Sequence, residues 1–126
     1  MKAARMKYEL SQTFFFEAAH TLRRQVEVEP SLRIHGHTYV AEVCVGGTPD
    51  PVSGMVVDLA LLRRSIAALR ETLDHRFLDH VEGLGPATLE NLSTYIWHAM
   101  AREYPTQLQW VEVRREVSGD RCRIQR

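Results

Sequence analysis

The feature that most constrains this chain is a set of three histidines spread over two stretches with β-strand character. His20 directly follows one strand-like stretch, residues 13–19, and His35 and His37 precede the other, residues 38–45. Residues i and i+2 of a strand point to the same face, so pairing the two stretches would bring His20 to the other two imidazoles. Three protein ligands with an open fourth position are typical of a catalytic zinc site. The pattern predicts such a site; the alternative is a His-x-His pair that binds no metal.

Length and charge exclude several classes of protein. The 126 residues fit one domain, residues 1–126, and the formal net charge is zero. A neutral chain argues against an extended nucleic-acid surface and against a polybasic membrane face. No apolar stretch is as long as a membrane span, and the basic start, residues 1–7, is not followed by the apolar run of a signal peptide. We expect a cytoplasmic protein in which Cys44 and Cys122 are free thiols.

Apolar periodicity predicts four strands and two helices. Asp58 is a suitable N-cap for the first helix and Thr88 for the second, which Pro105 ends. The predicted order is strand 8–20, loop 22–34, strand 35–45, helix 59–73, helix 89–104, strand 110–117 and strand 121–125. This order predicts an α+β fold with an antiparallel sheet. Two helices cover only one face, so the other face is expected to be solvated or to meet another subunit.

Several motifs occur in an order that resembles one enzyme family. They are residues 16–20 (FEAAH), 35–39 (HGHTY), 54–58 (GMVVD), 73–75 (LDH) and 88–91 (TLEN), followed by Glu116. The set resembles the 6-pyruvoyl-tetrahydropterin synthase family, which includes the bacterial 6-carboxytetrahydropterin synthases of queuosine biosynthesis. The similarity extends from Leu10 to Cys122.

The resemblance implies a tunnelling fold (T-fold), in which a four-stranded antiparallel sheet has two helices on one face. It also implies an oligomeric barrel, in which trimers join their sheets and two trimers form a homohexamer. Zinc is implied on His20, His35 and His37. The implied partner is a small-molecule pterin substrate, 7,8-dihydroneopterin triphosphate, with no nucleic acid and no membrane.

The resemblance also implies which residues hold the pterin. Glu116, on the penultimate strand, matches the family's pterin anchor, where a carboxylate accepts two adjacent N–H groups in a charge-assisted pair. Its alternative is a solvated strand residue, as we expect Glu112 to be. Thr88 and Glu90 match residues at the pterin end of the site, and both also suit the first turn of a helix.

A proton-transfer pair is implied at Asp74 and His75. A carboxylate orients an imidazole and stabilises its protonated form. Asp79 and His80 repeat the dipeptide five residues later and are the rival pair. The order of the family's motifs favours Asp74 and His75, and His98 is expected to be a surface residue.

The general base is where this chain departs from the family, whose members usually carry a cysteine shortly before His-Gly-His. No cysteine lies between His20 and His35. The bacterial position holds Ser31 and the mammalian position holds Glu29. A serine hydroxyl is too weakly acidic to replace a thiolate without a separate base, whereas a carboxylate accepts a proton if burial raises its pKa. Ser31, Glu29 and also Glu27 are therefore candidates, and each has the alternative of being an ordinary loop residue.

These observations predict a zinc-dependent, pterin-processing lyase that resembles 6-carboxy-5,6,7,8-tetrahydropterin synthase. The missing cysteine keeps two alternatives open. One is a glutamate-type variant that makes 6-hydroxymethyl-dihydropterin for folate. The other is a non-catalytic module that binds a pterin.

Overall fold

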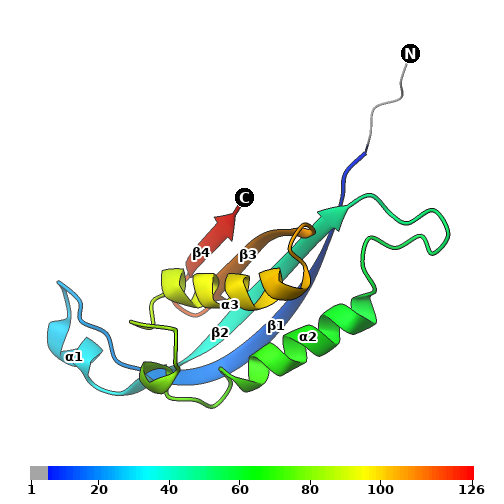
Figure 1. Ribbon diagram of the computed structural model, residues 1–126. Coiled ribbons are helices and arrows are strands. Elements are labelled where there is room, and N and C mark those ends of the chain that lie inside the picture. Colours follow the sequence, from blue (N-terminus) through cyan, green and yellow to red (C-terminus); the bar gives the residue numbers. More distant parts are fainter. Residues whose placement is uncertain (1–5) are drawn as a thin grey trace.

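The computed structural model describes residues 6–126, and its four strands form one antiparallel sheet in the order β1-β2-β3-β4 (Figure 1). The elements are β1 Tyr8–His20, α1 Val28–Leu32, β2 His35–Gly47, α2 Leu59–Glu71, the 3-10 helix η1 Leu78–His80, α3 Leu89–Glu103, β3 Leu108–Arg115 and β4 Asp120–Gln125. The predicted α+β class, the antiparallel sheet and the order of the strands and long helices are confirmed.

Strands β1 and β2 form a long antiparallel pair that fixes the histidines. Their register places His20 opposite His35, and Ala18 opposite His37. Residues that face each other across an antiparallel pair have side chains on the same face of the sheet. The pairing that brings the three histidines together was expected from the sequence, and it is confirmed.

The two long helices, α2 and α3, lie on the same face of the sheet (Figure 1). Both predicted caps are present: the Asp58 carboxylate accepts a hydrogen bond from Ala60 N at 2.9 Å, and Thr88 Oγ1 accepts one from Asn91 N at 3.1 Å. The core fills the space between helices and sheet. Its fully buried side chains include Phe16, Tyr39, Val43, Leu62, Leu92, Ile96, Val111 and Val113. This apolar layer holds β1 and β2 rigidly up to the end where the histidines lie.

The other face of the sheet carries a network of charges. Glu42 and Glu112 face each other across β2 and β3, and Arg114 Nη1 lies 3.2 Å and 2.8 Å from their carboxylates. Glu112 is only 4% exposed, because Arg114 and Arg123 lie over it. The expectation that Glu112 is a solvated strand residue is therefore wrong.

Two differences from the sequence-based expectation affect candidate site residues. The segment 22–34 is not all loop, because residues Val28–Leu32 form the short helix α1 after Glu27, which has a positive φ of 57°. Strand β3 ends at Arg115, so Glu116 lies in the turn after it and not on the strand. The turn closes early because Gly119 N donates to the Arg115 carbonyl, and Gly119 adopts a φ of 78°.

Both cysteines are free, as expected, and burial raises the pKa of the Cys44 thiol to about 12. Within residues 6–126, none of the helices has the length and apolar character needed to cross a membrane. Residues 1–5, which hold most of the basic N-terminal run, lie outside the described part of the chain.

Candidate metal centre and the cavities beside it

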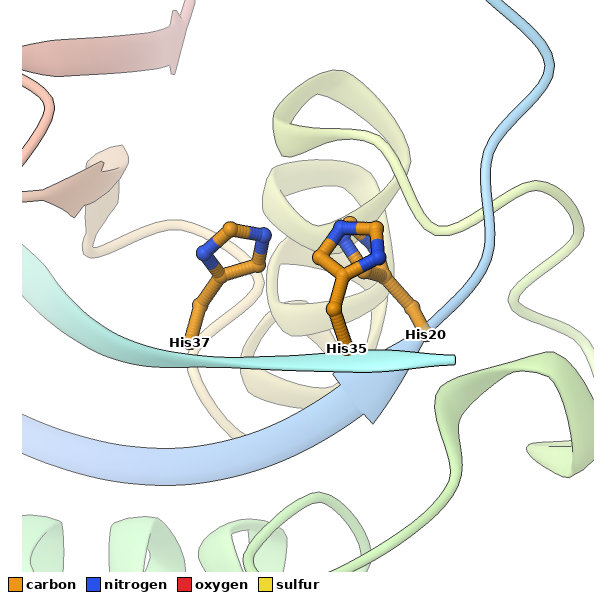
Figure 2. Close-up of side chains that lie close together, drawn as sticks. All are labelled: His20, His35 and His37. Carbon is orange, nitrogen blue, oxygen red and sulfur yellow. The ribbon is translucent and has the colours of Figure 1, made fainter. Parts of the chain in front are cut away.

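Three imidazoles gather where β1 ends and β2 begins, and their rings stand on one side of β2 (Figure 2). The ring centroids of His20, His35 and His37 are 4.5, 4.8 and 4.9 Å apart. One nitrogen from each ring lies within 4.8 Å of the other two. A tetrahedral zinc ion with Zn–N bonds of about 2.0–2.1 Å separates its ligand nitrogens by about 3.4 Å. Small rotations of the side chains therefore bring the three nitrogens to ligand geometry.

Backbone carbonyls decide which nitrogen of two rings is free. His20 Nδ1 lies 2.9 Å from the carbonyl oxygen of Ala87, and His35 Nδ1 lies 2.7 Å from that of Arg33. A carbonyl only accepts, so Nδ1 carries the proton in each neutral ring and Nε2 keeps a lone pair. Nε2 of His20 and Nε2 of His37 are buried with no hydrogen-bond partner within the described residues. Buried ring nitrogens without a protein partner, in rings that lie this close together, fit a metal ion, and the carbonyl contacts of His20 and His35 are the usual outer-shell support of such ligands.

The environment favours the neutral form of His20 and His37, which metal binding requires. Burial, together with the smaller effects of the neighbouring His20 and Arg115, lowers the pKa of His37 to about 4. Burial also lowers the pKa of His20. A neutral ring near pH 7 offers its lone pair without first losing a proton.

Asp79 takes part in this arrangement in a way the sequence did not indicate. Its carboxylate accepts hydrogen bonds from the backbone N–H of Thr21, at 3.0 Å, and from the Thr21 hydroxyl. Thr21 directly follows His20, so these hydrogen bonds connect the end of β1 to η1. His80, its neighbour in the rival pair, packs its ring edge-on against Phe77. Asp79 is thus placed to position a histidine of the cluster.

Asp74 and His75 form the hydrogen-bonded pair expected of a proton shuttle. Asp74 Oδ2 lies 2.8 Å from His75 Nδ1, while Asp74 Oδ1 accepts from Glu17 N at 2.9 Å. The Glu17 bond and the His75 bond lower the pKa of Asp74, which keeps it ionised. His75 is 76% exposed and lines a hollow of about 500 Å³ that His37 also lines. His75 of the pair and His37 of the cluster therefore border one solvent-accessible space.

Thr88 and Glu90 share a smaller cavity of about 210 Å³ with Tyr39 and Arg115. Glu116 is not among the residues that line it. Its carboxylate lies 2.7 Å from Arg114 Nε and its side chain is 61% exposed. Within one chain, the expected pterin residues are therefore split between two surfaces.

The candidate general bases lie in and beside α1. Glu29 is 81% exposed and forms an ion pair with Arg33 at 2.7 Å. Ser31 is buried, and its hydroxyl donates to the Val28 carbonyl at 2.7 Å. Glu27 precedes the helix. None of these three side chains lines the two cavities that adjoin the histidines.

Two residues near the cluster were missed by the sequence analysis although the sequence carries a signal for each. Tyr39 follows His37 by two positions, so the strand alternation that joins His35 to His37 places it on the same face. Arg115 continues the alternation of Val111 and Val113, which point into the core. A charged residue on an apolar strand face is unusual, and this departure from the pattern could have identified Arg115 as a candidate site residue.

Comparison with known proteins gives a consistent family. A profile described as 6-pyruvoyl tetrahydropterin synthase matches residues 9–125. A 6-pyruvoyl tetrahydrobiopterin synthase of Poecilia reticulata is 43% identical over 80 residues, which cover 60% of this chain and 54% of the relative. A 6-carboxy-5,6,7,8-tetrahydropterin synthase of Aquifex aeolicus is 34% identical over 86 residues, covering 58% of this chain and 53% of the relative. The matches thus span about half the length of these relatives.

Solved structures agree with the sequence comparison. A Caenorhabditis elegans 6-pyruvoyl tetrahydropterin synthase superposes with a TM-score of 0.81 at 26% identity, over 96% of each chain. A Plasmodium vivax 6-pyruvoyltetrahydropterin synthase, solved with a catalytic glutamate replaced by alanine, has a TM-score of 0.72 at 15% identity. That match covers 97% of this chain and 100% of the other, and at this identity it shows the fold alone.

Proposed function

The chain belongs to the 6-pyruvoyl tetrahydropterin synthase family, and on that premise we propose that it is a zinc-dependent pterin lyase acting on 7,8-dihydroneopterin triphosphate. The proposed reaction is that of a 6-carboxy-5,6,7,8-tetrahydropterin synthase, in which the substrate and one water molecule give the carboxypterin, acetaldehyde and triphosphate. The observation that carries the proposal is the cluster of His20, His35 and His37 beside the hollow that His75 lines. A relative named for this reaction supports the choice of product.

His20, His35 and His37 would hold the zinc ion through their Nε2 atoms. Lone pairs without a protein partner on two of these nitrogens, and carbonyl contacts behind two of the rings, favour this role. Zinc supplies Lewis acidity, which polarises the hydroxyls of the pterin side chain and makes the adjacent C–H groups more acidic. Within residues 6–126 this cluster offers three ligands, which leaves a coordination position for the substrate.

His75 would move protons and Asp74 would orient it. The carboxylate accepts from Nδ1–H, so Nε2 of the exposed ring is free to take a proton from the substrate or return it. Asp74 in turn is held by the Glu17 backbone N–H and by Arg70, whose Nη2 is 3.3 Å away. This support fixes the direction of the imidazole toward the hollow.

Glu116 would anchor the pterin ring, with Thr88 and Glu90 at the same end of the substrate. Because Glu116 and the cavity of Thr88 and Glu90 lie on separate surfaces of one chain, a complete pterin site would need a second copy. We propose the homohexamer that the family resemblance implies. The uncovered face of the sheet and its outer strand β4 are available for it, whereas the outer edge of β1 is occupied at Glu17 and Ala19 by backbone bonds to residues 75 and 76. A light-scattering mass of one chain at micromolar concentration would contradict this assembly.

A second candidate function follows from the absence of a cysteine between His20 and His35. A glutamate-type enzyme would cleave the side chain to give 6-hydroxymethyl-dihydropterin, with Glu29 or Glu27 as base. In the Plasmodium vivax 6-pyruvoyltetrahydropterin synthase the catalytic residue that was replaced is a glutamate, so a structure of this fold carries a glutamate in a catalytic role. The exposed ion pair of Glu29 with Arg33 would have to open for this role.

Product analysis tests these proposals. The zinc-loaded protein is incubated with 7,8-dihydroneopterin triphosphate, and pterins, acetaldehyde and triphosphate are quantified. Equal amounts of 6-carboxytetrahydropterin and acetaldehyde are expected, and His35→Ala should abolish both while the surface control His98→Ala retains them. Formation of 6-hydroxymethyl-dihydropterin would instead establish the glutamate-type reaction. Pterin binding with no turnover above an empty control would refute the lyase and leave a binding module.

A further inference from the structure

The outer edge of β1 is bonded, beside the metal cluster, to the segment that follows α2. A strand presents its backbone groups to one edge at every second residue. Glu17 N donates to Asp74 Oδ1 at 2.9 Å, and the Glu17 carbonyl accepts from His75 N at 2.6 Å. Two residues further on, Ala19 N donates to the Arg76 carbonyl at 3.1 Å. Residues 74–79, the edge segment, therefore lie along β1 as an additional partner of the strand.

Two aspartates fix the ends of the edge segment. Asp74 accepts the Glu17 N–H at one end, and Asp79 Oδ1 accepts the Thr21 N–H at the other end, at 3.0 Å. In both contacts a side-chain carboxylate takes the place that a backbone carbonyl has in an ordinary strand pair. Removal of either carboxylate would therefore detach one end of the edge segment from β1.

The conformation of His75 depends on this attachment. Its φ is 57°, in the left-handed region that residues other than glycine rarely adopt. Such a conformation persists only where the surrounding structure imposes it. Here the backbone N–H of His75 is bonded to Glu17, and its Nδ1 is bonded to Asp74, which Glu17 N also holds. The position of the imidazole is thus set by β1.

The edge segment also reaches a candidate metal ligand. His20 lies between Ala19 and Thr21, and both neighbours donate their backbone N–H groups to the edge segment. His75 is at one end of this row of bonds and Asp79 is at the other. A displacement of His20 at the end of β1 would therefore disturb the bonds that hold His75.

We propose that the edge segment couples the position of His75 to that of His20, and that Asp79 is the positioning residue that closes its far end. The proposal rests on the proposed function and extends it, because it assigns Asp79 a role in turnover besides the retention of zinc. Asp79 acts through Thr21 and the edge segment, without touching the substrate.

Amide hydrogen exchange at His75 measures this coupling without any substrate. Zinc should slow exchange of the wild-type His75 N–H by about 10-fold relative to chelator-treated protein, because a metal ion on His20 restrains the end of β1. Gly54 N, which donates to the Asp50 carbonyl at 2.8 Å, is the internal control. It follows the far end of β2, and its exchange should be unaffected. Absence of a zinc effect on His75 in the wild type would overturn the proposal.

Variants of Asp79 test its part in the coupling, at zinc concentrations that saturate every protein by metal analysis. In Asp79→Ala the effect of zinc on His75 exchange should fall below twofold. Asp79→Asn keeps an oxygen acceptor for the Thr21 N–H and should retain most of the effect, and the exposed control Glu82→Ala should match the wild type. An undiminished zinc effect in zinc-loaded Asp79→Ala would refute the role of Asp79.

Turnover of 7,8-dihydroneopterin triphosphate separates positioning from zinc retention. With the metal site saturated, Asp79→Ala should lower kcat by about 10-fold and change KM less than threefold, because His75 is misplaced while the metal ligands remain. Asp79→Asn should recover most of the lost kcat. An unchanged kcat in Asp79→Ala would contradict the proposal.

Failure of the proposed function gives a different result. A wild-type protein without turnover refutes the lyase, whereas a zinc effect on His75 exchange that Asp79→Ala abolishes would still establish the coupling. A wild-type protein that binds no zinc refutes both proposals.

Discussion

Acidification should destabilise the metal-free protein through His37. Burial lowers the pKa of this imidazole from 6.5 to about 4 in the folded chain. Below pH 6.5 the unfolded chain therefore takes up a proton that the folded chain does not, and stability falls as the pH falls. The loss from this one group begins near pH 6.5 and is complete near pH 4. Its full size is about 3 kcal/mol, at about 1.4 kcal/mol for each unit of pKa.

Most of this loss of stability is expected between pH 7.5 and pH 5.0. Over this range the two pKa values of His37 give a loss of about 2 kcal/mol in the free energy of unfolding. Ordinary carboxylates, with pKa values of about 4, remain mostly ionised at pH 5.0. Burial lowers the pKa of His20 as well, so its contribution has the same sign and increases the total.

Urea denaturation with a chelator present, at one fixed protein concentration, measures the effect at both pH values. His37→Asn removes the titrating group and should reduce the pH-dependent loss by about 2 kcal/mol. His98→Asn is the matched control, because His98 is exposed on α3, and it should behave like the wild type. If His37→Asn loses as much stability as the wild type between pH 7.5 and 5.0, the burial of His37 does not depress its pKa and the reasoning is wrong.

Further substitutions test three separate parts of the site. Asp79→Ala should weaken zinc binding by about 10-fold, measured in competition with a chelator, because the Thr21 N–H and hydroxyl lose their acceptor. The exposed residue Glu82 provides the control, and an equal effect of Glu82→Ala would contradict this role of Asp79. Glu116→Gln should cost about 2–4 kcal/mol of pterin binding by calorimetry and leave the zinc content unchanged; unaltered affinity would mean that the ring is anchored elsewhere. Ser31→Cys should raise the rate of 6-carboxytetrahydropterin formation if α1 occupies the position of the loop that carries the catalytic cysteine in the bacterial enzymes. No gain in Ser31→Cys, together with a loss of turnover in Glu29→Gln, would favour the glutamate-type reaction.

The sequence by itself determined the elements that carry the site. Alternation fixes which residues of a strand share a face, so the faces of His35 and His37 followed from their spacing. The helix N-caps at Asp58 and Thr88 were also predictable from the sequence, because an N-cap depends on a few neighbouring residues. Hydrogen bonding between Asp74 and His75 was also predictable, since they are adjacent in the chain.

Only the tertiary structure decided the contacts between residues distant in sequence. Asp79 and His80 form the same dipeptide as Asp74 and His75, yet η1 directs the Asp79 carboxylate to Thr21 at the end of β1. Burial is likewise a property of the packed sheet: Glu112 is covered by arginines of β3 and β4, and no local pattern shows that. The lone pair that Nε2 keeps in His20 depends on the carbonyl of Ala87, which is 67 residues away in the sequence, so the orientation of this ligand follows from the fold.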